Sequence, residues 1–332
     1  MYETFYGFNA KPFQLKPDPR FFFGSKGHNR AMAYLEYGIS QGEGFIVITG
    51  EIGAGKTTLM RNLFCELKSE NIVAAQIVNT HVGSDDILRL VAAAFGLEYE
   101  NATKATLLHR VEQFLKQCDR QGKRALLVVD EAQNLTPRAV EELRMLSNFY
   151  TEDKSLLQTF LLGQPEFRRV LLSEDMEQLL QRVIASYHLG PLDIGETQSY
   201  IEHRLQTVGW KGNPTISTEA FSAIYSYTGG IPRKINSLCD RMFLMGYIEE
   251  LQAFDESEVN QVIADIKQEF KLPPEKVEIP VNLTALGLKD SYAYSNAENM
   301  DDRMARMERS ISSVIDALKK MLPSSKMNNS PD

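Results

Sequence analysis

Cysteine is scarce in this sequence of 332 residues, which has three cysteines and no C-x-x-C pair. Cys65, Cys118 and Cys239 lie far apart on expected helices, so the sequence excludes a disulfide framework and predicts packed thiols in a reducing compartment. No run of about 18 or more apolar residues occurs, so no membrane-spanning helix is expected. The first residues lack a basic region followed by an apolar one, so no secretory signal is expected either. These absences predict a cytoplasmic protein.

Basic residues are fewer than acidic ones. The chain has 36 lysines and arginines and 44 aspartates and glutamates, which give a formal net charge of −8. An acidic sum argues against a protein coated with nucleic acid, although it leaves room for a local basic patch. Hydrophobic residues make up 43% of the chain and charged residues 24%, which is ordinary for a globular protein. The length suffices for two or more domains.

Residues 50–57, GEIGAGKT, match the pattern G-x-x-x-x-G-K-[ST] between an apolar strand at 45–48 and a helical pattern from residue 59. Glycines let such a loop turn its N–H groups inward, the helix N-terminus adds partial positive charge, and the lysine adds a full charge. The stretch predicts a nucleoside-triphosphate site, and the alternative is a glycine-rich turn that happens to contain lysine. The residues assigned to the nucleotide are Gly50, Glu51, Ile52, Gly53, Ala54, Gly55, Lys56, Thr57 and Thr58.

A second stretch, ALLVV at 125–129, predicts a strand buried on both faces and ends in two carboxylates, Asp130 and Glu131. In a parallel sheet such residues lie at the edge where ligands bind. We expect Asp130 and the Thr57 hydroxyl to hold Mg²⁺, and Glu131 to orient and deprotonate the attacking water. The alternative is an acidic N-cap for a helix at 137–149. The phosphate loop, about 75 residues upstream, favours the catalytic interpretation.

Further strands are expected at 72–78, 156–162 and 183–189, with helical patterns between them. This alternation predicts an α/β fold, a three-layer αβα arrangement with a five-stranded parallel sheet. Gln164 follows the strand at 156–162 and is placed to touch the γ-phosphate or the attacking water. A simple turn residue is the alternative for Gln164.

The rest of the chain is expected to divide by composition and periodicity. Aromatic and proline residues near the start predict an extended segment across the surface of the following domain, which would serve for packing, as a partner-binding arm, or beside the adenine. Three apolar heptads near the end would form a coiled coil between protomers, dock onto the body or await a partner. The expected parts are an extended segment (1–25), an α/β nucleotide-binding domain (26–192), a small all-helical lid (193–270), a linker (271–299), a heptad tail helix (300–322) and a disordered tail (323–332).

Together, these motifs resemble those of the AAA+ ATPases and, within them, the family of general secretion pathway protein A. The resemblance spans residues 1–265 and extends to the ATPases associated with exosortase (PEP-CTERM) and exopolysaccharide-export systems. It rests on KPFQLKPDPRFFFGSKGHNRAMAYLEYGI, GEGFIVITGEIGAGKTTL, VVDEAQNL, LLGQPEF, QRVIASYHLGPL and GGIPRKINSLCDR.

The resemblance implies roles that spacing alone does not give. Arg182 would be the arginine finger that reaches a neighbouring subunit's γ-phosphate, and Arg233 the lid arginine called sensor 2. Gln164 falls near sensor 1, and Asn79 near the polar residue that restrains the catalytic glutamate between cycles. ATP and Mg²⁺ would be the cofactors, and ATP is favoured over GTP because no N-K-x-D motif occurs.

Two functions are expected. The first is a homo-oligomeric ATPase, with a hexameric ring as one form, that couples hydrolysis to assembly or regulation of a cell-envelope secretion or exopolysaccharide export system. It would be cytoplasmic, and any contact with the inner membrane would run through a partner. The second is an ATP-dependent DNA-binding regulator of the transposition or replication-loader type, which the acidic charge and the missing helix-turn-helix disfavour. The secretion protein continues into a membrane span and a peptidoglycan-binding domain, so secretin insertion is not expected as the direct task here.

Overall fold

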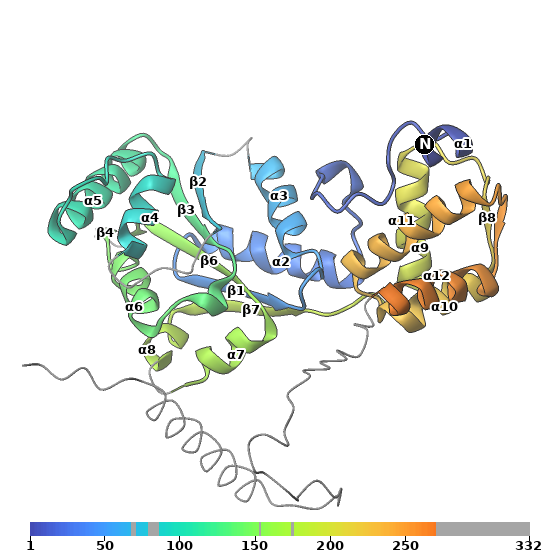
Figure 1. Ribbon diagram of the computed structural model, residues 1–332. Helices are drawn as coiled ribbons and strands as arrows, with labels where there is room; N and C mark the ends of the chain where they lie inside the picture. Colours follow the sequence, from blue (N-terminus) through green and yellow to red (C-terminus); the bar gives the residue numbers. More distant parts are fainter. Residues whose placement is uncertain (68–70, 79–85, 153, 174–175, 270–332) are drawn as a thin grey trace, which may run out of the picture. The chain divides into compact units, whose positions relative to one another are not determined.

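The computed structural model describes residues 1–67, 71–78, 86–152, 154–173 and 176–269. They belong to one compact unit, Met1–Lys271 (Figure 1). Asn79, the expected linker, the heptad helix and the tail lie outside the described residues, and the boundaries predicted at 25/26 and 192/193 stay predictions. Within the described ranges, no helix is both long enough and apolar enough to cross a membrane.

The centre of the unit is a five-stranded parallel sheet, as the alternating pattern predicted. Its strands lie in the order β2-β3-β6-β1-β7, so β1 occupies an interior position. Every residue of β1 and of β6 is buried, because these strands are almost continuous apolar runs covered on both faces. The strands are β1 (Phe45–Gly50), β2 (Ile72–Ile77), β3 (Arg124–Val129), β6 (Leu157–Gly163) and β7 (Val183–Leu189).

The strand order and register bring the ends of three interior strands together. Val129 pairs with Leu161, and Thr49 pairs with Gly163, in parallel alignment. The residues that follow β1, β3 and β6 therefore meet at the carboxyl edge of the sheet, where parallel α/β sheets bind their ligands.

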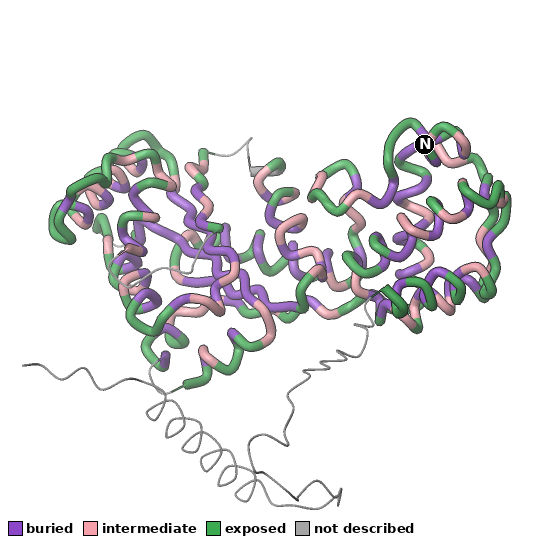
Figure 2. Tube along the Cα trace, in the orientation of Figure 1, coloured by how far each residue is buried: buried purple, intermediate pink, exposed green. Residues whose placement is uncertain are grey.

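Helices cover both faces of the sheet, which confirms the three-layer arrangement. Alternate residues of β1 enter different cores: Phe45 and Val47 pack with α4 to α8, whereas Ile46 and Ile48 pack with α2 and α3. Figure 2 shows the buried strands as a purple band between partly exposed helices. The helices are α2 (Lys26–Gln41), α3 (Lys56–Leu67), α4 (Asp86–Ala94), α5 (Lys104–Arg120), α6 (Pro137–Leu146), α7 (Pro165–Leu171) and α8 (Glu177–Leu180), with the 3₁₀ turn η2 (Ala132–Asn134).

After residue 192 the described chain is mainly helical, as predicted. Asp193 and Glu196 form a complete capping box at the start of α9, and Ser217 caps α10. The structure adds a two-residue parallel pair, β8 (Thr215–Ile216) with β9 (Ala253–Phe254), which is too short to leave a period in the sequence. An antiparallel hairpin with two residues in each strand, β4 (Tyr150–Thr151) and β5 (Lys154–Ser155), is likewise too short to be predicted from the sequence. The helices are α9 (Ile194–Thr207), α10 (Thr218–Thr228), α11 (Pro232–Ile248) and α12 (Glu256–Glu269).

The N-terminal segment differs from its prediction in conformation and in place. It contains a helix, α1 (Tyr2–Tyr6), and a 3₁₀ turn, η1 (Pro19–Phe21), because its first proline comes only at residue 12. Most of its aromatic side chains enter the core of the four helices α9 to α12, whereas Phe22 packs against the core of α2 and α3. Tyr6, for example, meets Phe243 edge to face at a centroid distance of 5.4 Å.

The three cysteines are unpaired, as expected, but not all are packed. Cys118 and Cys239 are buried, whereas Cys65 on α3 is exposed. The expectation that all three thiols are packed is therefore wrong for Cys65.

Candidate active site

The loop of residues 50–55 joins β1 to α3 at the carboxyl edge of the sheet. Gly53 and Gly55 have φ angles of 84° and 103°, which side chains with a Cβ rarely adopt. A Cβ on Gly53 would lie 2.4 Å from the Arg233 Cβ, and one on Gly55 would lie 2.6 Å from the His28 Nε2. These two glycines therefore provide both the curvature of the loop and its close contact with α2 and α11.

Lys56 is the first residue of α3 and is only 7% exposed. Its ammonium Nζ donates to the carbonyl oxygens of Gly50, at 2.6 Å, and of Glu51, at 3.0 Å. Burial lowers the pKa of Lys56, while the nearby carboxylates Glu131 and Asp130 oppose that shift. The ammonium is thus held across the loop and faces the two acidic residues that follow β3.

Asp130 follows β3 and is 4% exposed. Its Oδ2 accepts a hydrogen bond from the Thr57 hydroxyl at 3.2 Å, and its Oδ1 accepts one from the Glu131 backbone N–H at 3.0 Å. Burial raises the pKa of Asp130, and these two hydrogen bonds and the Lys56 charge act against it. Thr57 and Asp130 therefore meet as predicted for a shared metal.

The Thr57 and Asp130 oxygens fit a Mg²⁺ ion. No cluster of three or more His, Cys, Asp or Glu side chains exists among the described residues. Mg²⁺ does not require such a cage, because it binds through one or two protein oxygens together with waters and substrate phosphates. Adjacent hydroxyl and carboxylate oxygens beside a phosphate loop meet that requirement.

Glu131 adopts a left-handed backbone conformation, with φ at 53°, at the start of the 3₁₀ turn η2. Its side chain caps no helix, and α6 begins instead with Thr136, whose hydroxyl accepts from the Ala139 N–H. The N-cap interpretation of Glu131 is therefore wrong. The turned backbone directs the carboxylate toward neighbouring side chains at the sheet edge.

Two glutamine side chains hold the Glu131 carboxylate. Gln133 Nε2 donates to Glu131 Oε2 at 2.6 Å, and Gln164 Nε2 donates to the same oxygen at 3.1 Å. Gln133 Oε1 also accepts from the Gln164 backbone N–H at 2.9 Å. Burial raises the pKa of Glu131, but these donors and the Lys56 charge outweigh it, so the pKa lies below its ordinary value.

Gln164 is more than a turn residue, because its amide contacts Glu131 while its side chain makes no capping bond to α7. Gln133 was not predicted from the sequence. Its position two residues after Glu131, at the same strand end, was the available signal.

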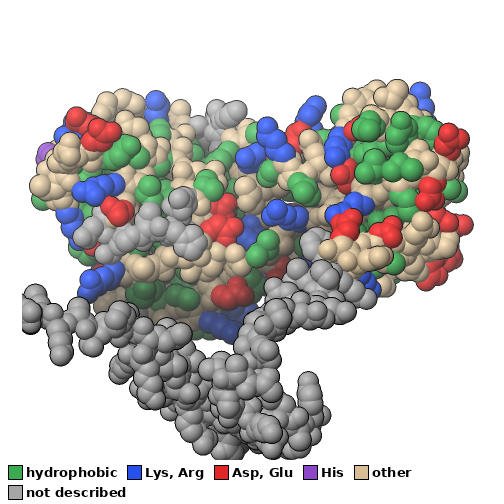
Figure 3. Space-filling model, viewed as in Figure 1, with side chains coloured by type: hydrophobic (Ala, Val, Ile, Leu, Met, Phe, Trp, Pro, Cys, Tyr) green, Lys and Arg blue, Asp and Glu red, His purple; other side chains and the backbone are tan. Residues whose placement is uncertain are grey.

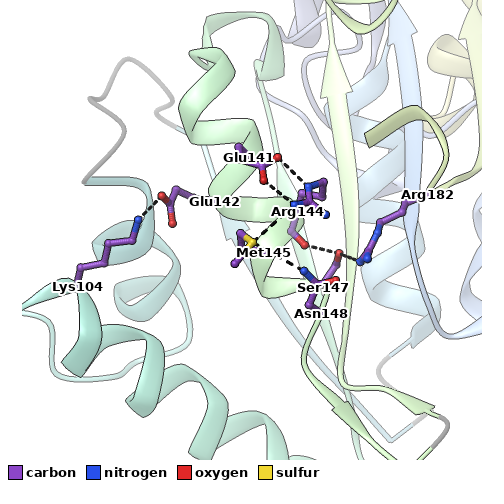
Figure 4. Close-up of polar contacts among 8 residues, drawn as sticks. All are labelled: Lys104, Glu141, Glu142, Arg144, Met145, Ser147, Asn148 and Arg182. Carbon is purple, nitrogen blue, oxygen red and sulfur yellow. Dashed lines mark hydrogen bonds and ion pairs between the residues drawn. The ribbon is translucent and has the colours of Figure 1, made fainter. Parts of the chain in front are cut away.

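Arg233 and Arg182 occupy different places. The Arg233 backbone N–H donates to the Gly53 carbonyl at 3.2 Å, which brings the start of α11 against the loop. The Arg182 carbonyl instead accepts from the Phe45 N–H at the beginning of β1, and its guanidinium donates to the Ser147 hydroxyl at 2.8 Å (Figure 4). A six-residue strand, about 16 Å long, separates that position from the phosphate loop. Arg182 therefore does not join the site of its own chain.

A cleft of about 280 Å³ continues from the loop. Its walls come from the loop and Glu131, from residues 14–18 and 21–23 of the N-terminal segment, and from side chains of α9 and α11. The segment before the first α/β helix thus lines the same cleft as the phosphate loop, and its place beside the adenine stays a prediction.

His28 on α2 also lines this cleft, and the sequence analysis did not identify it. Its Nε2 lies 3.1 Å from the Ala54 carbonyl and its Nδ1 lies 2.7 Å from the Ser25 hydroxyl. Because a carbonyl only accepts, Nε2 carries the proton. Burial lowers the pKa of His28, so the neutral imidazole supports the loop.

Comparisons with known proteins agree with this geometry. Residues 39–171 match the family model described as AAA domain. General secretion pathway protein A of Aeromonas hydrophila is 38% identical over 248 residues, which are 74% of this chain and 45% of that protein. The chain therefore spans less than half the length of that relative.

Solved structures share the fold at low identity. The Aeropyrum pernix ORC2 protein (ADPNP-ADP complexes) is similar with a TM-score of 0.60 and 17% identity, covering 77% of this chain and 72% of that one. Cdc6p from Pyrobaculum aerophilum has a TM-score of 0.60 and 14% identity, covering 79% and 74%. The RuvB Holliday junction branch migration motor of Thermotoga maritima has a TM-score of 0.50 and 20% identity, covering 74% and 70%. Residues 39–171 match an AAA domain, and the chain has the AAA-type P-loop NTPase fold.

Proposed function

We propose that the chain binds and hydrolyses ATP with Mg²⁺ at the carboxyl edge of its sheet. The observation that carries this proposal is the Glu131 carboxylate, which two glutamine amides hold at 2.6 and 3.1 Å beside the buried Lys56. A carboxylate with a lowered pKa is ionised at neutral pH, the form in which it can orient a water and accept its proton. An ammonium and a row of loop N–H groups beside it suit the phosphates of a nucleotide.

Each group has one task in the proposed reaction. The loop N–H groups and Lys56 bind the phosphates, and Arg233 adds positive charge from the lid. Mg²⁺, when bound at Thr57 and Asp130, neutralises charge on the β- and γ-phosphates. Glu131 orients a water and takes its proton. Gln164 contacts Glu131 at the end of β6, where its amide can reach the γ-phosphate or that water. Asn79, outside the described residues, stays assigned to restraining Glu131.

We further propose that hydrolysis requires a homo-oligomer, with a hexameric ring as one form. The support is the place of Arg182 at the opposite edge of the sheet from its own phosphate loop. An arginine that reaches a neighbour's γ-phosphate would complete the positive charge of the site. Such a finger contributes on the order of 10³-fold or more to the rate in nucleotide hydrolases.

The proposed cellular task is to serve a cell-envelope export apparatus from the cytoplasm, with contact to the inner membrane through a partner. Similarity to general secretion pathway protein A supports an envelope partner. The finer assignment, to an exosortase and exopolysaccharide-export system, rests on the sequence motifs alone. Pull-down with the full chain, with and without ATP, tests for an export-system protein.

DNA binding is the competing proposal. Its structural support is a shared fold at 14–20% identity, which carries no function. The four-helix part of the chain exposes acidic side chains that do not suit a phosphate backbone, including Glu249, Glu250, Asp255 and Glu256. The face in Figure 3 mixes acidic and basic side chains over these helices. Tight, salt-dependent retention of duplex DNA on a filter in the presence of ATP would favour the DNA proposal.

The substitution Glu131→Gln tests the proposed hydrolysis. It keeps the shape and hydrogen-bonding capacity of the side chain but removes its basicity, so kcat should fall about 100-fold or more while the Kd for ATP changes little. Calorimetry gives the Kd and phosphate release gives kcat. Glu219→Gln, at an exposed position of α10, is the matched control and should behave as wild type. Hydrolysis by Glu131→Gln at the wild-type rate would contradict the assignment.

A further inference from the structure

Three buried polar side chains form a relay between α9 and α11 beside the cleft. Arg204 and Tyr200 on α9 are each 6% exposed, and Asn236 on α11 is 7% exposed. Arg204 Nη1 donates to the Tyr200 hydroxyl oxygen at 2.9 Å, and the Tyr200 hydroxyl donates to Asn236 Oδ1 at 2.9 Å. All three residues line the cleft.

The direction of this relay is fixed by chemistry. Arginine only donates hydrogen bonds, so the Tyr200 oxygen accepts from Arg204. The single Tyr200 proton is then left for Asn236, whose contacting atom must be the carbonyl oxygen. The orientation of the Asn236 amide is therefore set, and its Nδ2 group with two N–H donors points away from Tyr200.

The Asn236 Nδ2 group is open to the cleft. No hydrogen bond within the described part of the chain uses Nδ2. Nor is Nδ2 among the buried unpaired side-chain atoms of the described residues, which are Thr159 Oγ1, Thr197 Oγ1 and His203 Nε2. Nδ2 is unpaired and is not among the fully buried atoms, so it retains some solvent-accessible surface. Because Asn236 lines the cleft, that surface faces the cleft.

The surroundings of Asn236 suit a planar base better than a phosphate. Arg204 lies over the Phe21 ring with its guanidinium carbon 4.7 Å from the ring centroid, and it donates to the Pro12 and Gln14 carbonyls at 2.6 and 3.2 Å. These contacts hold the aromatic part of the N-terminal segment as one wall of the cleft. A neutral amide donor beside aromatic rings recognises the edge of a stacked ring system.

The position of Asn236 relative to the phosphate loop also suits contact with the base of a nucleotide. Asn236 follows Arg233 by three residues on α11, which is a rise of about 4.5 Å along the helix. The Arg233 N–H contacts the Gly53 carbonyl of the phosphate loop. A nucleotide with its phosphates on the loop has its base within reach of the next turn of α11.

We propose that Asn236 contacts the base of the nucleotide by donating an amide N–H to a ring nitrogen of adenine. The inference rests on the proposed function, because it deepens the same nucleotide site. Adenine offers three ring nitrogens as acceptors, N1, N3 and N7. A fixed donor opposite one of them loses its partner when that nitrogen is replaced by C–H.

Calorimetry on the wild-type protein tests the inference without any substitution. Binding of ATP is compared with binding of 1-deaza-, 3-deaza- and 7-deaza-ATP, each lacking one ring nitrogen. One analogue should bind about tenfold more weakly than ATP, the loss expected for one hydrogen bond that leaves a buried donor unsatisfied. Equal binding of ATP and all three analogues would overturn the inference.

A variant then assigns the donor. Asn236→Leu should bind ATP about tenfold more weakly, and it should no longer distinguish ATP from the sensitive analogue. Inorganic tripolyphosphate, which has no base, should bind the variant and the wild type equally. Ser237→Ala, at the exposed next position of α11, is the matched control and should keep the discrimination. Discrimination that persists in Asn236→Leu would overturn the assignment to Asn236.

Failure of this inference is distinguishable from failure of the proposed function. A wild type that binds ATP and all deaza analogues alike keeps its nucleotide site and loses only the role of Asn236. A wild type that binds neither ATP nor tripolyphosphate contradicts both. Asn236→Asp, which keeps an acceptor for Tyr200 and removes the two donors, replaces Asn236→Leu if that variant melts at a lower temperature than wild type.

Discussion

The two ends of the strands in the parallel sheet carry different charged groups. At the carboxyl edge, Lys56 donates to carbonyl oxygens of the glycine loop, and the charges of Asp130 and Glu131 act on its pKa. The amino edge carries Arg182, bonded to Ser147 (Figure 4), and among the described residues no ion pair includes Arg182. This separation is the basis for the proposal that Arg182 acts in the site of a neighbouring subunit.

Removing the Arg182 side chain should give the largest effect on the rate of hydrolysis. Arg182→Ala should lower kcat about 10³-fold and leave the Kd for ATP unchanged, because the guanidinium acts on a neighbour's transition state. Arg182→Lys should recover only part of the rate, since an ammonium lacks the planar fork of arginine. Phosphate release at saturating ATP measures both, and exposed Arg120→Ala is the control. A dilute Arg182→Ala monomer with full activity would contradict the shared site.

Removing Gln133 should have a smaller effect, confined to the carboxyl edge. Gln133→Ala deletes the shorter of the two amide hydrogen bonds to Glu131, so the pKa of Glu131 should rise. Because the base must be ionised, activity is lost as pH falls through that pKa, and the acid limb of kcat should move to higher pH. A kcat profile between pH 4 and 9 measures the shift. Exposed Gln113→Ala should leave the profile in place, and an unmoved limb in Gln133→Ala would show that the glutamine does not tune Glu131.

His28 should give the smallest effect, on stability. Burial holds its pKa below the unfolded value, so the folded state binds fewer protons and stability is lost as pH falls below about 6.5. His28→Gln should therefore lose a few degrees less in Tm than wild type between pH 7 and pH 5. Thermal melting of both proteins checks this, with exposed His109→Gln as control. Identical pH slopes for His28→Gln and wild type would remove His28 from the support of the loop.

The sequence predicted the parts of the molecule that depend on short-range patterns. Strands such as β3 are continuous apolar runs, and the glycine loop has a fixed spacing, so the sheet, the loop and the Asp130–Glu131 pair were predictable. The motifs singled out Gln164 for contact with the γ-phosphate or the attacking water, and the structure shows its amide bonded to Glu131. Such features carry their signal within a few residues.

The missed features depend on contacts between distant parts of the chain. Gln133 donates to Glu131 at a turn where the Glu131 backbone has a positive φ. No pattern in the sequence predicts that turn. His28 contacts the Ala54 carbonyl, which lies 26 residues away in the sequence. The N-terminal aromatic residues were correctly expected to pack, but their partner is the distant core around Phe243. Local sequence does not specify which of several apolar surfaces a segment joins.

Mixing two inactive variants tests the shared site most directly. Arg182→Ala subunits keep the phosphate loop but lack the finger, and Lys56→Ala subunits lack phosphate binding but keep Arg182. A site completed by a neighbour predicts that an equimolar mixture hydrolyses ATP well above either variant alone, at the oligomer concentration where wild type is active. A mixture no more active than its parts, under conditions where sizing shows mixed oligomers, would contradict it.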